Sequence, residues 1–169
     1  MDVPIGKMTK LGLYLTALEA YTFIKKEAPN VLFIDLRSQA ELACVGAPMI
    51  IDANIPYKFV NWQQWDEKNK NFKMVVNERI VSLIESCLQQ KGFNKQTPVI
   101  LICRAGFWSA WTADLLAVAG YKKVYNIIDG FEGDKAIRGP KQGQRDINGW
   151  KNSDLPWSYE LDKTKMYFG

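Results

Sequence analysis

One stretch of this chain constrains its fold more than any other: residues 98–120, PVILICRAGFWSAWTADLLAVAG. Its first part, Val99–Ile102, is a short apolar run rich in β-branched side chains, and Pro98 bounds it. A run of this kind and length predicts a buried strand of a parallel sheet. Only residues 103–107 separate this strand from a segment with helical spacing. A strand joined to a helix by so short a loop is typical of α/β folds, in which parallel strands alternate with helices.

The rest of the stretch predicts a helix that begins at residue 108 or 109 and ends at residue 119. Trp111, Leu115 and Val118 recur there at helical spacing. Gly120 follows, and glycine suits the left-handed conformation that commonly ends a helix. The N-terminus of this helix therefore comes directly after the loop.

Cys103 occupies a special place in this arrangement, because it lies at the carboxyl end of the strand and one loop before the helix. Backbone N–H groups of the loop and of the first helical turn can point at its sulfur, while Gly106 allows the loop to curl. The helix dipole and the adjacent Arg104 favour negative charge there, so we expect the reactive thiolate to be populated. The alternative is an ordinary core cysteine, but the loop context favours a nucleophile.

The composition is that of a globular protein, with 169 residues, 47% hydrophobic and 24% charged. This length suits one domain with a sizeable core. The net charge of +4 is small and scattered, so we expect no nucleic-acid partner and at most a weak preference for anionic substrates. No apolar run is long enough for a membrane span. The start MDVPIGKMTK lacks the apolar core of a signal peptide, so we expect a cytoplasmic protein, or a periplasmic one if a signal was removed.

The chain contains no histidine, and this excludes several kinds of catalytic site. Ser-His-Asp and Cys-His nucleophiles and histidine metal sites all require that residue. The three cysteines are far apart in sequence and form no CxxC motif, so we expect neither a metal nor a disulfide framework. Cys87 falls on the apolar face of a predicted helix and is expected in the core. Cys44 is either a partly buried structural residue or a resolving thiol for Cys103.

The remaining pattern predicts a sheet whose strands alternate with helices. Thr16 and Glu19 match a capping box at the start of a helix. Asp35 and Arg37 come at the end of a predicted strand, and the carboxyl ends of parallel strands share the edge where ligands bind. Strands are predicted over residues 11–15, 31–36, 49–55, 99–102 and 123–128, with helices over 17–27, 39–43 and 79–91 between them.

Two long segments do not fit this alternation. Residues 57–79 are rich in aromatic and charged side chains, and we expect little regular structure there. They form either a surface loop tied down by Trp62 and Trp65 or a flap that covers the site or contacts a partner. Residues 132–148 are glycine-rich and charged, which predicts a loop. We find no domain boundary, so residues 1–169 are expected to form one domain with a core at about 16–157 and a C-terminal tail.

Several segments together resemble a known family. VLFIDLR, MIIDANIP, the stretch from CRAGFW to IIDGF, and the later GW and LPW are similar to the single-domain rhodanese sulfurtransferases. The resemblance implies an α/β fold, a single rhodanese-like domain with a five-stranded, mainly parallel sheet flanked by helices. The tail from NGW to YF also resembles a group of bacterial rhodanese-like proteins, several of them exported.

The resemblance also implies a reaction. Cys103 would accept a sulfane sulfur from a small donor such as thiosulfate or a persulfide, and pass it to cyanide or a thiol, with a protein as a possible acceptor. No cofactor is implied. Asp35 and Arg37 would brace the loop, the alternative being a surface salt bridge of little value. The residues implied to bind substrate are Arg104, Ala105, Gly106, Phe107, Trp108 and Ser109.

The loop departs from the family pattern CRSGxRS at two positions. Ala105 replaces serine, and Trp108 stands where a second arginine is common. A cation is therefore lost, and we expect thiosulfate to be a weak donor. Trp108 is expected either to line the cleft or to pack beneath the loop.

Two other functions are alternatives to sulfur transfer. Tyrosine phosphatases and arsenate reductases use a related loop with an arginine that binds an oxyanion, but Ser109 stands six residues after Cys103 and no arginine takes that role. The stronger alternative is a non-catalytic rhodanese-like module used for binding or for sulfur sensing.

Overall fold

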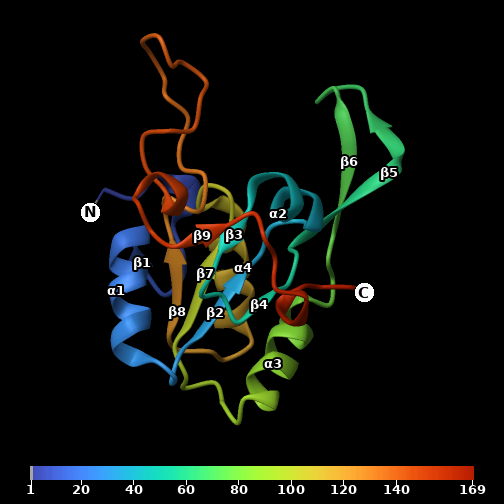
Figure 1. Cartoon of the computed structure of the whole chain (residues 1–169). Helices are drawn as coiled ribbons and strands as arrows, with labels where there is room; N and C mark the ends of the chain where they lie inside the picture. Colours follow the sequence, from blue (N-terminus) through green and yellow to red (C-terminus); the bar gives the residue numbers. More distant parts are fainter. Residues whose placement is uncertain (1) are drawn as a thin grey trace.

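A parallel sheet lies at the centre of the molecule, with helices on both of its faces (Figure 1). The computed structural model describes residues 2–169. The sheet has five strands in the order β1-β8-β7-β2-β4, and its neighbouring strands pair in parallel, as predicted. Its strands are β1 (Tyr14–Leu15), β2 (Leu32–Asp35), β4 (Ala53–Asn54), β7 (Val99–Ile102) and β8 (Val124–Ile127). The helices are α1 (Ala17–Glu27), α2 (Gln39–Val45), α3 (Ile80–Gln90) and α4 (Phe107–Val118), with short 3-10 turns η1 (Ile5–Lys7), η2 (Trp150–Asn152) and η3 (Lys163–Lys165).

Both faces of the sheet are covered, which explains why its central strands read as unbroken apolar runs. All four residues of β2 and of β7 are buried, and successive side chains alternate between the two faces. One face packs against α3 and α4 through a cluster that includes Leu101 and Cys103. The other packs against α1, α2 and the fully buried Trp150. Cys87 lies at the margin of the first cluster, as expected for a core-facing residue of α3.

Side-chain caps fix where two helices begin. The predicted capping box at α1 is present, because Glu19 N donates to Thr16 Oγ1 and Thr16 N donates to Glu19 Oε2. Ser38 and Glu41 form the same reciprocal pair at α2. Each box satisfies N–H groups that a helix start otherwise leaves unpaired.

The helix after Cys103 begins slightly earlier than predicted, at Phe107. Its buried side carries small residues, Ser109, Ala110 and Ala113, together with Leu116. Small side chains allow the helix axis to lie close to the sheet. The apolar residues whose spacing predicted this helix are instead on its exposed side: Trp111, Leu115 and Val118 are 50%, 43% and 71% exposed.

The strand predicted over residues 49–55 is wrong in most of its length. Only Ala53–Asn54 joins the central sheet, beside β2. A turn at residues 49–50 separates it from β3 (Ala47–Pro48), which pairs antiparallel with β9 (Trp157–Ser158). Proline has no N–H to donate, so Pro48 suits this short edge pairing rather than a central strand.

Residues 57–79 form a β-hairpin, and the prediction of little regular structure there is wrong. β5 (Lys58–Asp66) pairs antiparallel with β6 (Asn71–Val76), with an irregularity between Asn61 and Trp65. Phe72 contacts Trp62 and Trp65 edge-on, with ring centroids 5.0 and 5.5 Å apart. Aromatic contacts of this kind stabilise strand pairs, so side chains that suggested a tied-down loop hold a hairpin together.

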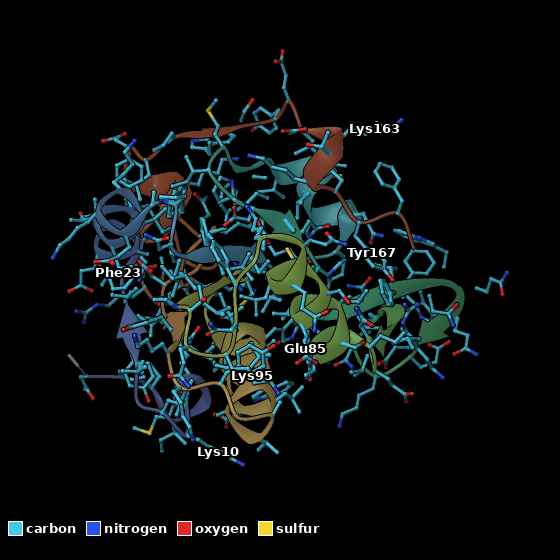
Figure 2. The ribbon with its side chains drawn as sticks, turned by 90° about the horizontal axis from the view of Figure 1, so that it is seen from below. Lys10, Phe23, Glu85, Lys95, Lys163 and Tyr167 are labelled. Carbon is cyan, nitrogen blue, oxygen red and sulfur yellow. The ribbon has the colours of Figure 1, made fainter. Side chains whose placement is uncertain are left out.

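The hairpin projects from the body of the molecule and is closed at its base (Figure 1). Asn77 N donates to Tyr57 O at 2.8 Å, just outside the paired strands. Phe59 stacks on Tyr167 of the C-terminal tail, with ring centroids 5.5 Å apart. Figure 2 labels Tyr167 in this tail. The tail therefore packs beside the foot of the hairpin.

Residues 132–148 contain no helix or strand and project from the same end of the molecule toward which β8 points (Figure 1). This outcome agrees with the predicted loop. Backbone hydrogen bonds between Ala136 and residues 143 and 144 close its outer part on itself. None of the helices within residues 2–169 combines the length and the apolar character needed to cross a membrane.

Candidate functional site

Cys103 lies directly after β7 and three residues before Gly106, the N-cap of α4, as its sequence context predicted. Its sulfur accepts a hydrogen bond from Ser109 N at 3.4 Å and lies 3.2 Å from Ser109 Oγ. Ser109 belongs to the first turn of α4, whose N–H groups have no partner within the helix. Cys103 is only 2% exposed. The N-terminus of α4 is therefore aimed at a sulfur that water barely reaches, an arrangement that favours an anion there.

Two glycines allow the loop to fold so tightly. Gly106 has φ +85°, and a Cβ there would lie 2.3 Å from Ile128 O. Gly130 has φ +63°, and a Cβ there would lie 2.6 Å from Ala105 N. Any side chain at either position would collide with backbone, so both glycines are required by this close approach.

Backbone hydrogen bonds from the segment after β8 hold the loop in place. Phe131 N donates to Cys103 O at 2.8 Å, and Glu132 N donates to Arg104 O at 3.0 Å. The two loop carbonyls are thereby directed away from the thiol. Within residues 2–169, the N–H groups of residues 104–106 have no hydrogen-bond acceptor, so they remain available to an anion.

A small cavity of about 50 Å³ opens beside the thiol. This is room for a few atoms beyond the sulfur, since one water-sized sphere needs about 10–15 Å³. Its lining combines one nucleophile, two cations and apolar walls. The lining residues are Cys103, Arg104, Ala105, Phe107, Trp108 and Arg145.

Trp108 lines the cavity and also packs at the margin of the core. Its ring lies 6.1 Å from that of Tyr57, and Lys58 Nζ lies 5.5 Å from its centroid. Trp108 joins the margin of the core cluster that includes Cys103. One wall of the cavity is therefore apolar at the position where the family pattern has a cation.

Asp35 and Arg37 form a fully buried ion pair, so the surface salt bridge considered from the sequence is wrong. Both side chains are 0% exposed, and Arg37 Nη2 donates to Asp35 Oδ2 at 2.6 Å. The guanidinium of Arg37 lies 3.9 Å from the ring centroid of Phe131. Phe131 N in turn donates to the Cys103 carbonyl, so the ion pair contacts a residue that is hydrogen-bonded to the loop.

Arg145 is the residue at this site that sequence reasoning missed. It comes from the loop 132–148, far from Cys103 in sequence, and lines the same cavity. Burial lowers the pKa of its guanidinium, and the positive charge of Arg104 lowers it further, while Glu132, Asp134 and Cys103 act in the opposite direction. No motif in the sequence marks this arginine, because its place depends on how the loop folds back.

The base of that loop is anchored to the body by a buried carboxylate. Asp129 accepts hydrogen bonds from Ala17 N at 2.9 Å and Gly149 N at 3.3 Å. Burial raises the pKa of Asp129, and these hydrogen bonds and Lys7 partly offset the effect. The group joins the start of α1 to the point where the loop returns.

The other cysteines lie outside the cavity. Cys44 is exposed on α2, which corrects the expectation that it is partly buried, and it forms no disulfide. Burial raises the pKa of the Cys87 thiol, and the nearby Asp52 adds to the effect. Among the residues that the structure describes, no group of three or more acidic or cysteine side chains is placed to hold a metal ion.

Comparison with known proteins supports the family resemblance. The model of the rhodanese-like domain family matches residues 17–136. An uncharacterized protein of Rickettsia conorii is 30% identical over 130 residues, which cover 77% of this chain and 85% of that protein. An uncharacterized protein of Rickettsia prowazekii is 31% identical over the same shares of the two chains.

Solved structures share the fold. The crystal structure of Rv0390 from M. tuberculosis superposes with a TM-score of 0.61 at 23% identity, covering 87% of this chain and 97% of that one. The polysulfide-sulfur transferase homodimer of Wolinella succinogenes gives a TM-score of 0.51 at 18% identity, over 86% of this chain and 77% of that one. With the sheet, the loop around Cys103 and the family match in agreement, this chain belongs to the rhodanese-like domain family.

Proposed function

We propose that the protein is a sulfurtransferase in which Cys103 carries the transferred sulfur as a persulfide. One observation supports this above the others: the Cys103 sulfur accepts an N–H from the first turn of α4 inside a cavity flanked by Arg104 and Arg145. This environment stabilises negative charge beside the sulfur, which the anionic persulfide requires. Membership of a family associated with sulfur transfer is consistent with the proposal.

The first step is a displacement at sulfur. The Cys103 thiolate attacks the outer sulfur of thiosulfate, a new S–S bond forms, the old S–S bond breaks, and sulfite leaves with the bonding pair. In the second step cyanide attacks the outer persulfide sulfur, thiocyanate leaves and the thiolate is restored. Neither step moves a proton when the thiolate is already formed, so no general base is needed. This suits a chain without histidine.

Intact mass spectrometry tests the proposal directly. After incubation with thiosulfate or a polysulfide and removal of excess donor, we expect the protein to gain the mass of one sulfur, and to lose it when cyanide is added. Cys103→Ser is expected to gain none, while Cys44→Ser serves as a matched control on the exposed thiol and behaves as the wild type. Equal sulfur uptake by Cys103→Ser, or none by the wild type from any donor, would overturn the proposal.

The exposed aromatic side chains of the hairpin favour a second candidate, a module that binds a protein. Trp62, Trp65 and Phe72 are 63%, 48% and 38% exposed, and such residues are enriched at interfaces. The two functions are compatible if the bound protein supplies the accepting thiol. A wild type that takes up no sulfur but still captures a protein through the hairpin would favour binding alone.

A further inference from the structure

We infer that Arg145, together with Arg104, forms a binding site for the distal oxyanion of an anionic sulfur donor, replacing the cation that Trp108 removes from the loop. The inference rests on the proposed function and names the class of donor: a sulfane sulfur attached to a sulfonate-like group, of which thiosulfate is the simplest example. It also revises the expectation that thiosulfate is a weak donor.

The location of Arg145 is the first argument. It lines the same 50 Å³ cavity as Cys103, Arg104 and Trp108. A donor whose outer sulfur meets the thiol in so small a space must place its remaining atoms among these side chains. Two of them are arginines, which match oxyanions through several N–H groups in a fixed geometry.

Arg145 also has side-chain N–H groups that form no hydrogen bond within the described residues. Its Nη1 donates to Gly133 O, which orients the guanidinium. Within the described residues 2–169 this is the one hydrogen bond of its side chain, and it forms no ion pair with a carboxylate. The nearby Asp134 is engaged elsewhere, by Lys7 at 2.6 Å and Asn148 at 3.1 Å. The other N–H groups of Arg145 therefore remain available to a ligand.

The positive charges of Arg145 and Arg104 also favour an anion between them. Arg145 is half-buried and close enough to Arg104 for the two charges to oppose each other. Such an arrangement is unfavourable in the empty protein and is relieved when an anion enters between the cations, a pattern typical of functional sites. The reactants need this compensation, because a thiolate and thiosulfate together carry three negative charges.

The backbone around Arg145 is fixed rather than loose. Its carbonyl accepts a hydrogen bond from Asn152 Nδ2 at 3.2 Å, and the same amide group donates to Glu132 O and Asn148 O. Asp134 N donates to Asn148 Oδ1 at 2.7 Å. These contacts join both ends of the loop at the level of the cavity, so the guanidinium is held in position before a donor arrives.

The test compares donors that differ in charge. We expect Arg145→Ala to raise the KM for thiosulfate about tenfold, the loss of one charge-assisted contact, with a smaller change in kcat. Transfer from an uncharged donor, such as an organic trisulfide, is expected to change less than about twofold. Arg145→Lys keeps the charge and is expected to recover part of the loss.

Arg138→Ala is the matched control, because Arg138 is an exposed arginine of the same loop that does not line the cavity. We expect it to behave as the wild type with both donors. The KM for thiosulfate is also expected to rise with salt in the wild type, and more weakly in Arg145→Ala.

The outcomes separate the two claims. Equal losses with both donors would assign Arg145 a structural role and overturn the inference, as would an unchanged KM for thiosulfate. Either result leaves sulfur transfer by Cys103 intact, because the trisulfide is supplied together with a small thiol. The Cys103 thiolate attacks its central sulfur as RS⁻ leaves, the thiol then removes the second RS group as a disulfide, and the persulfide that remains is measured in the same experiment. Failure of the wild type to load sulfur from any donor would instead overturn the proposed function, and this inference with it.

Discussion

The hairpin of β5 and β6 and the loop 132–148 both project from the body of this protein, but they relate to Cys103 in different ways (Figure 1). The hairpin is regular, held by cross-strand aromatic contacts, and closed at its base by Asn77 and Tyr57. The loop has no regular structure, yet its base is tied to the body and it places Arg145 in the cavity. A projecting segment therefore needs no regular secondary structure to place a side chain in the cavity.

The comparison also shows what composition reveals about function. The tryptophans suggested a flap over the site as one role for the hairpin, but none of the hairpin residues lines the cavity beside Cys103. Lys58, at its foot, does not line the cavity and lies with its Nζ 5.5 Å from the ring centroid of Trp108, which does. The glycine-rich, charged loop 132–148 contains no tryptophan, yet it supplies Arg145 to the lining of the cavity. Arg145 lines the cavity because of where the folded loop places it, which composition does not reveal. Exposed aromatic side chains, by contrast, are typical of surfaces that bind a partner.

Loosening the base of the loop 132–148 is expected to have the largest effect. Lys7 is buried and contacts Asp134 Oδ1 at 2.6 Å and Ile128 O at 2.7 Å. Lys7→Met removes both contacts, and we expect a loss of about 2 kcal/mol in the free energy of unfolding. Urea unfolding measures the loss. We also expect the KM for thiosulfate to rise severalfold, because Asp134 helps fix the loop that carries Arg145.

Lys10→Met is the matched control, since Lys10 is an exposed lysine near the same turn. It is expected to leave both stability and KM unchanged. A destabilised Lys7→Met protein with an unchanged KM would show that Asn148 and Asn152 position the loop without this anchor.

A smaller effect is expected from the buried carboxylate that joins α1 to the returning loop. Because burial raises the pKa of Asp129 in the folded protein, the folded state takes up its proton more readily than the unfolded chain. Its contribution to stability is then greatest at low pH and is lost as the pH rises through the folded-state pKa. We expect the wild type to gain stability relative to Asp129→Asn on going from about pH 7 to pH 5.

Parallel urea titrations of the two proteins across that range measure this difference. The change is expected to be smaller than that caused by Lys7→Met, because the hydrogen bonds from Ala17 and Gly149 oppose the effect of burial. A difference that is constant with pH, or that grows in the opposite direction, would contradict the assignment.

Shortening the hairpin is expected to change the small-molecule reaction least. Asn61 and Lys73 face each other across the two strands, so residues 62–72 can be replaced by an Asn-Gly turn. This removes Trp62, Trp65 and Phe72 but keeps the foot of the hairpin. We expect transfer from thiosulfate to cyanide to stay within about twofold, because the cavity is untouched.

Transfer to protein thiols is the reaction in which the shortened hairpin is expected to differ from the wild type. If the hairpin docks an accepting protein, the shortened variant is expected to lose transfer to that protein while transfer to a small thiol persists. A large loss of transfer to cyanide would show that the hairpin acts on the cavity after all, and would contradict the distinction drawn here.

Much of the fold and the central part of the site were predictable from sequence. The strand Val99–Ile102, the loop with Cys103 and Gly106, and the capping box at Thr16 follow from periodicity and from residues that act on their immediate neighbours. Such signals survive in a sequence because they involve residues only a few positions apart. The family resemblance added the number of strands in the sheet, whereas their order came only from the structure.

Tertiary structure decided what depends on residues distant in the chain. The ladder of β5 and β6 needed a register between two segments, and the exposure of Trp111 depended on how closely α4 approaches the sheet. Phe131 packs on the buried Arg37, and Arg145 reaches the cavity beside Cys103 from the distant loop 132–148. The sequence thus determined the position of Cys103 and the loop around it, which are local, while the second cation at the cavity came from long-range packing that no local pattern encodes.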